Sequence, residues 1–165
     1  SYGGGRTQEA IMPENIISKD DLIQAFTDAY ERVIEAAMLA TQNSVARSPD
    51  GWGPREAVAH LAGWEAMASV RIPAIAGGMA PLEFEDEAQN EVMNNAINAA
   101  FVAVAGQQPA AALCDTLRQA YQRTAALLRT LDDRHFQPGE YVYERTRGAI
   151  EHCDEHIEQF SAAQA

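Results

Sequence analysis

The amino-acid sequence predicts an all-α protein, a helical bundle folded as one domain. Apolar residues recur every three or four positions in five segments, which is the period of a helix with one buried face. No segment alternates apolar and polar residues over enough length to seed a sheet. Alanine supplies much of the 47% hydrophobic fraction, which favours helices that pack closely together. A length of 165 residues fits a single domain.

The domain is expected to comprise residues 18–165, preceded by a flexible N-terminal segment at 1–17. Its first helix is expected over 19–42. Ser18 can cap this helix, and two aspartates follow in the first turn, where acidic side chains favour a helix. The apolar stripe of the helix comprises Leu22, Phe26, Tyr30, Val33, Ile34 and Ala37.

A strong turn signal at residues 48–51 separates the first helix from the second. The second helix is expected to start at Pro54, because a proline in the first turn loses no hydrogen bond there. It should continue towards Ile72, and Pro73 should bend or end it. A long crossover loop is then expected near 73–86.

The remaining helices are expected over 87–104, 110–131 and 145–162, with a short extended piece at 141–143. The inward side of the third helix is expected to comprise Val92, Met93, Ile97, Phe101 and Val104. The elements therefore amount to four core helices plus a short extra one, or to four with one interrupted. Either arrangement is a bundle with one long crossover connection.

Three of the four histidines fall inside predicted helices. His152 and His156 are four residues apart, so both project from one face of the last helix and can hold one metal ion. His60 lies in an apolar stretch, where a buried imidazole needs a hydrogen bond or a metal. The alternative is that His60 is a satisfied core residue and the pair lies on a solvated face. His135 is expected at the surface.

Other residues offer weaker signals. Cys153 could be a soft ligand or a reactive thiol, although a cysteine in a helix is more often a small buried hydrophobe. Glu56 and Glu65 flank His60 and could accept a hydrogen bond from an imidazole or act as a base, or they could be surface acids. Three further polar residues lie near the start of the last helix, where a pocket could open: Tyr141, Tyr143 and Arg147.

Composition excludes several classes of protein. A formal net charge of −12 argues against nucleic acid and against anionic membranes as partners. Two cysteines are too few for a secreted disulfide scaffold, and no apolar run is long enough to span a bilayer. We therefore expect a soluble cytoplasmic protein. The sequence contains neither a glycine-rich phosphate loop nor the elbow motif of serine hydrolases.

Two motifs resemble those of the DinB superfamily, which includes YfiT-like putative metal hydrolases, the N-terminal domain of mycothiol-dependent maleylpyruvate isomerase, bacillithiol transferases and the ClbS/DfsB self-protection proteins. Residues 51–65, GWGPREAVAHLAGWE, resemble the second helix of the family, which carries a tryptophan and the pair His-Leu. Residues 151–160, EHCDEHIEQF, resemble its terminal helix with two histidines four apart. The helix lengths and the long link after the second helix also agree.

The resemblance implies a four-helix bundle in up-down-down-up order, often a homodimer. It also implies His60, His152 and His156 as ligands of a zinc, nickel or similar ion. The chain departs from the isomerase-like branch, which tends to have glutamate at the position of His152 and carries a second domain. The chain therefore resembles the general DinB-like type more than any named branch.

The leading hypothesis is a metal-dependent thiol S-transferase or hydrolase that acts on a small electrophilic compound. A low-molecular-weight thiol would serve as cosubstrate, and Glu65 would be the base. A second hypothesis is a non-catalytic self-resistance protein that sequesters an apolar natural product, with Trp52, Trp64 and the segment 77–82 around the ligand. A third is a stress-linked structural dimer whose metal only joins helices.

Overall fold

The computed structural model describes residues 17–43 and 51–162. Most of the predicted flexible segment at 1–17 and most of the turn signal at 48–51 lie outside these ranges. Within the described residues the chain forms five α-helices and a short 3-10 helix, and it contains no strand. The all-α prediction is therefore confirmed. No helix among the described residues is long and apolar enough to cross a membrane.

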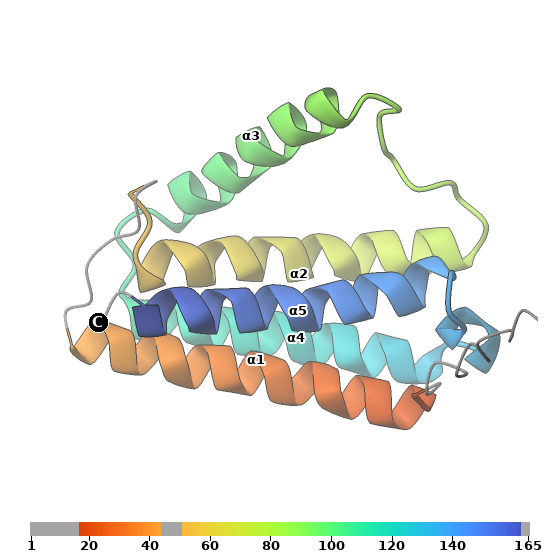
Figure 1. Cartoon of the computed structure of the whole chain (residues 1–165), viewed down its shortest axis with the longest axis horizontal. Coiled ribbons are helices and arrows are strands. Elements are labelled where there is room, and N and C mark those ends of the chain that lie inside the picture. The colour runs from red at the N-terminus through yellow and green to blue at the C-terminus, as the bar shows by residue number, and fades with distance from the viewer. Residues whose placement is uncertain (1–16, 44–50, 163–165) are drawn as a thin grey trace, which may run out of the picture.

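Four helices form the bundle, and the remaining α-helix lies outside it. The bundle comprises α1 (Lys19–Gln42), α2 (Pro54–Ala76), α4 (Ala110–Thr130) and α5 (Tyr141–Ala162). The outer helix is α3 (Glu87–Ala105), and the 3-10 helix η1 (Asp133–Phe136) precedes α5. In Figure 1, α1 and α5 run in one direction and α2 and α4 in the opposite one, while α3 leans away from the bundle above α2. The core lies between α1, α2, α4 and α5.

The ends of the helices follow from local sequence. The hydroxyl of Ser18 accepts a hydrogen bond from the backbone N–H of Asp21 at 3.1 Å, as expected of an N-cap. At the start of α2, Pro54 occupies the first turn, and the carboxylate of Glu56 accepts from the backbone N–H of Gly53 at 3.0 Å. The start of α2 is thereby fixed six residues before His60.

Two predicted boundaries were wrong. Pro73 does not end α2, which continues to Ala76. Pro73 is exposed and lies in the last turn, so solvent can satisfy the carbonyl that it leaves free, and its own carbonyl still accepts from Gly77 at 2.9 Å. The predicted extended piece at 141–143 is instead the first turn of α5. Three residues are too few for periodicity to distinguish a strand from a helical turn.

The contact between α3 and the bundle depends on a glycine. A Cβ atom at Gly63 in α2 would lie 2.2 Å from the ring of Phe101 in α3, so only glycine lets the ring rest on the backbone. Ile97 and Met93 share this half-buried side, one and two turns before Phe101. The predicted side of α3 was wrong at Val92 and Val104, which are 70% and 83% exposed. Val92 lies nine positions before Phe101, which is half a turn away around a helix.

Substituting Gly63→Ala is expected to displace Phe101 and to lower the free energy of unfolding by about 1–3 kcal/mol. Gly148→Ala is the matched control, because Gly148 is an exposed glycine inside α5 with no atom within 4 Å of an added Cβ. The control should stabilise the protein by about 0.5–1 kcal/mol. Urea denaturation of both variants measures the difference. Equal effects would show that the α2–α3 contact does not need a glycine.

Candidate metal centre

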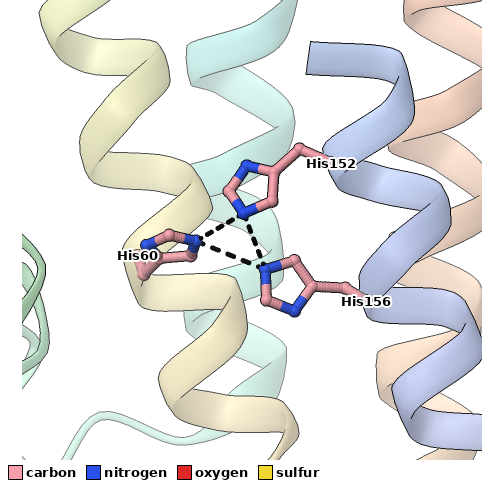
Figure 2. A group of neighbouring side chains, drawn as sticks. All are labelled: His60, His152 and His156. Atoms are coloured by element: carbon pink, nitrogen blue, oxygen red, sulfur yellow. Dashed lines mark hydrogen bonds between the residues drawn. The ribbon is translucent and has the colours of Figure 1, made fainter. Parts of the chain in front are cut away.

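Three imidazole rings from two helices meet between α2 and α5. Figure 2 shows His60 on α2 facing His152 and His156 on α5, with the three Nε2 atoms pointing at one another. The Nε2 atom of His152 lies 3.0 Å from that of His60 and 3.1 Å from that of His156, and the remaining pair is 3.3 Å apart. His60 and His156 are buried, and His152 is half-buried. The structure thus brings together the three histidines that the sequence singled out.

An asparagine on α3 determines which ring nitrogen of His60 carries the hydrogen. The Nδ1 atom of His60 lies 2.8 Å from Oδ1 of Asn98, and the indole N–H of Trp64 donates to the same oxygen at 2.6 Å. Because an indole nitrogen can only donate, the Asn98 atom between the two rings is the oxygen. His60 must therefore carry its hydrogen on Nδ1, and the lone pair of its Nε2 points at the other two histidines.

A second amide oxygen acts in the same way on His156. Its Nδ1 lies 3.1 Å from Oε1 of Gln159, so a hydrogen on Nδ1 leaves a lone pair on Nε2. The lone pairs of His60 and His156 then face each other at 3.3 Å, an arrangement that is relieved by a cation between them or by a hydrogen on Nε2 of His152. Acceptors that bond the far ring nitrogen in this way typically orient the imidazole ligands of metals.

Burial keeps the site in the neutral form that binds metals. Desolvation, reinforced by the charge of His156, lowers the pKa of His60 to about 4, although the hydrogen bond to Asn98 opposes the shift. Desolvation, followed by the charges of His156 and His60, lowers the pKa of His152 to about 3. At neutral pH these two imidazoles are unprotonated, as a metal ligand must be.

Three imidazoles with converging nitrogens fit a divalent transition metal. Ligand atoms bound about 2.0–2.1 Å from one ion lie about 2.8–3.4 Å apart at octahedral to tetrahedral angles, which brackets the separations of the three Nε2 atoms. No protein-family model, curated protein or solved structure matches this chain. Membership of the DinB superfamily therefore stays a prediction. The evidence for a metal site is the geometry of the histidines themselves.

Glu65, the predicted base, lies in a buried polar cluster. It is fully buried, and its Oε1 accepts hydrogen bonds from the hydroxyl of Tyr30 and the guanidinium of Arg145. These contacts join α2 to α1 and α5 and favour a structural role for the carboxylate. The alternative that Glu56 and Glu65 are surface acids was wrong, since both are buried. Each has a partner that accounts for its burial, namely the backbone at the start of α2 for Glu56 and Arg145 on α5 for Glu65.

The other candidate residues lie apart from the triad or are engaged elsewhere. Cys153 is fully buried, and burial together with the charge of Glu65 raises the pKa of its thiol to about 12, so it is a small core residue. Arg147 is exposed, 3.7 Å from Glu151, and lies over the ring of Tyr143. His135, predicted at the surface, is half-buried in η1.

The sequence analysis missed the residues that orient the histidines. Asn98 and Gln159 are polar residues on amphipathic helices, where a polar side chain normally indicates the solvent face. Trp52 was considered only as a pocket residue, yet its ring centroid lies 5.1 Å from that of His60. Of these residues, only Trp64 could be placed near His60 from the sequence. It follows His60 by one helical turn, and residues four apart share a face.

Substituting Asn98→Leu is expected to weaken metal binding by about 10- to 100-fold, because His60 loses the acceptor that fixes its protonation. Asn95→Leu is the matched control, since Asn95 is exposed on the same helix. Competition between the protein and a chromophoric chelator for zinc measures both affinities. An unchanged affinity in the Asn98 variant would contradict the role assigned to this residue.

Acidification is expected to destabilise the metal-free protein. Histidines of the unfolded chain titrate near pH 6.5, whereas His60 and His152 have pKa values of about 4 and about 3 when folded. Between these values the unfolded chain binds more protons, so the free energy of unfolding falls as the pH falls. Urea denaturation of chelator-treated protein at several pH values measures the fall. His152→Gln should reduce it, and an equal fall in that variant would argue against the burial effect.

Proposed function

We propose that this chain is a DinB-like metal-dependent enzyme, a thiol S-transferase or hydrolase that acts on a small electrophilic compound. The observation that carries the proposal is the convergence of three Nε2 atoms within 3.3 Å, two of them held as lone-pair donors by amide oxygens. The relative directions of α1, α2, α4 and α5, with α3 in the crossover, support an up-down-down-up arrangement of the DinB type. A homodimer is part of the same proposal.

His60, His152 and His156 would hold a zinc or nickel ion. When bound, the ion would supply a Lewis acid that polarises an electrophile or activates water or a thiol at a position that protein ligands leave open. The chain itself contributes three converging imidazoles in a largely buried setting, where His60 and His152 stay unprotonated at neutral pH. Asn98 and Trp64 keep His60 aimed at its partners.

The nucleophilic thiol is proposed to come from solution. Cys153 is the cysteine nearest to the triad in sequence, but its thiol is fully buried and its pKa of about 12 keeps it protonated. A low-molecular-weight thiol is therefore the proposed cosubstrate. The net charge of −12 favours a neutral or cationic electrophile over a nucleic acid or another polyanion.

A groove between α2 and α3 favours a second candidate function, sequestration of an apolar compound without turnover. The groove has a volume of about 780 Å³, within the range of ligand pockets. Its walls are almost entirely apolar and include Ala59, Ala62, Ala66, Phe101 and Val104. A self-resistance protein that only binds its ligand would need such a surface, whereas an enzyme also needs the ion.

Purified wild-type protein is expected to bind one zinc or nickel ion per chain, and His60→Ala should lose it. His135→Ala is the control, because His135 lies in η1 outside the triad. Metal content is measured by mass spectrometry after equilibration with each ion, together with the melting temperature. Wild-type protein without stoichiometric metal, and a His60→Ala variant with unchanged metal content and stability, would contradict the metal site.

Turnover separates the candidate functions once metal is present. The metal-loaded protein is expected to consume an electrophile such as 1-chloro-2,4-dinitrobenzene in the presence of a low-molecular-weight thiol, and chelation should abolish the reaction. Stabilisation by an apolar ligand without turnover would favour sequestration. Loss of stability on chelation, with neither turnover nor ligand binding, would favour a metal that only joins helices.

A further inference from the structure

A cavity lies under the crossover segment 77–86 and extends along α2 from Ile75 back to Trp64, one turn after His60. Its volume is about 690 Å³, and it adjoins a smaller cavity of about 380 Å³. The two share Trp64, Arg71, Glu83 and Tyr141 as lining residues, and we call them together the crossover cavity. Both volumes lie within the usual range for small-molecule pockets.

Arg71 is unusual among the arginines of this chain. Four arginines in the described residues are half-buried, and three of them pair with a glutamate: Arg55 with Glu56, Arg118 with Glu31 and Arg145 with Glu65. Arg71 has no carboxylate within 4.0 Å among the described residues. In a protein with twice as many acidic as basic residues, such an arginine stands out.

Arg71 lies against the cavity wall, although no carboxylate pairs with it among the described residues. Its guanidinium carbon lies 5.8 Å from the centre of the Trp64 ring, a cation–π contact. Withdrawing a guanidinium from water is costly unless an anion compensates. Because Arg71 lines both parts of the crossover cavity, a ligand there can supply that anion.

The rest of the wall is suited to an apolar body. Ile75, Met79, Leu82 and Met93 line the larger part of the cavity. Met79 and Leu82 are 65% and 75% exposed, so a ligand lying against them would remove apolar surface from water. The charged groups of the wall besides Arg71 are the exposed Glu83, Glu144, which accepts from the backbone N–H of Gly139, and Arg145, which is paired with Glu65. Arg71 beside the apolar surface is therefore the position that suits the charged end of an amphipathic anion.

We propose that the crossover cavity binds a small organic carboxylate, with its carboxylate on Arg71 and its apolar body against Met79 and Leu82. Arg71 lies eleven residues after His60, about 16 Å along the axis of α2 at 1.5 Å per residue. The position proposed for the carboxylate is therefore separate from the metal centre, although the cavity wall also includes Trp64, which bonds Asn98 beside His60. The proposal depends neither on a bound metal nor on the proposed reaction.

Fluorescence titration tests this site with three probes of matched shape, 4-phenylbutyrate, 4-phenylbutyramide and 4-phenylbutylamine. The sequence contains two tryptophans, so Trp52→Phe leaves Trp64, the ring under Arg71, as the one reporter. In this background the carboxylate should change the emission in a saturable manner and bind at least about tenfold more tightly than the amide, because charge-assisted hydrogen bonds are the strong ones. The amine should bind most weakly.

Substitutions that remove a positive or a negative charge from the cavity wall test whether Arg71 binds the carboxylate. Arg71→Gln should remove the preference for carboxylate over amide, and Arg71→Lys should keep part of it. Glu83→Gln should strengthen carboxylate binding, because Glu83 is an exposed acid on the same cavity wall. Arg123→Gln, an exposed arginine on α4, is the control and should change nothing. Circular dichroism confirms that each variant is folded.

Absence of saturable carboxylate binding to the folded protein would overturn the proposal. Equal affinities for carboxylate and amide would also overturn it, as would tighter binding of the amine, which would assign the cavity to a cation held by Glu83. A carboxylate preference that survives Arg71→Gln would place the anion elsewhere. None of these outcomes bears on whether the triad binds a metal.

Discussion

The proposed metal centre depends on the convergence of three imidazole nitrogens between α2 and α5. Two of the three are held as lone-pair donors by amide oxygens, and both of these nitrogens lie 3.0–3.1 Å from Nε2 of His152. In the metal-free protein a hydrogen on Nε2 of His152 can be shared between them, and moving that hydrogen to Nδ1 gives an ion its third lone pair. The two orienting amides therefore favour a metal ligand set over a set of satisfied core residues.

The three nitrogens converge only if α2 and α5 keep a fixed register relative to each other. A buried polar cluster holds that register. Glu65 lies five residues after His60, and Arg145 seven residues before His152, so their ion pair joins the same two helices near the triad. Tyr30 on α1 bonds the same carboxylate oxygen. A buried ion pair adds little net stability, but a shifted register would leave both charges unpaired, which is strongly unfavourable. The cluster thus selects the register in which the histidines converge.

Helices and shared helix faces, which depend on periodicity, were predicted from the sequence. Contacts between residues far apart in the chain were not. Helical spacing sufficed for the α-helices and for the shared face of His152 and His156, and the apolar context of His60 indicated its burial. Asn98 was missed because α3 is brought to His60 by tertiary contacts with α2, among them the packing of Phe101 on Gly63 and on Trp64. The burial of Glu65 was also missed, because its partner Arg145 is 80 residues away and no local pattern links them.

X-ray absorption spectroscopy of the zinc-loaded protein tests the three-histidine centre most directly, because it reports the type and distance of the ligand atoms. The account predicts one ion per chain with three imidazole nitrogens at about 2.0–2.1 Å. It also predicts no sulfur ligand, since Cys153 is buried in the core and protonated. Sulfur at about 2.3 Å, or fewer than three imidazoles around the ion, would contradict the account.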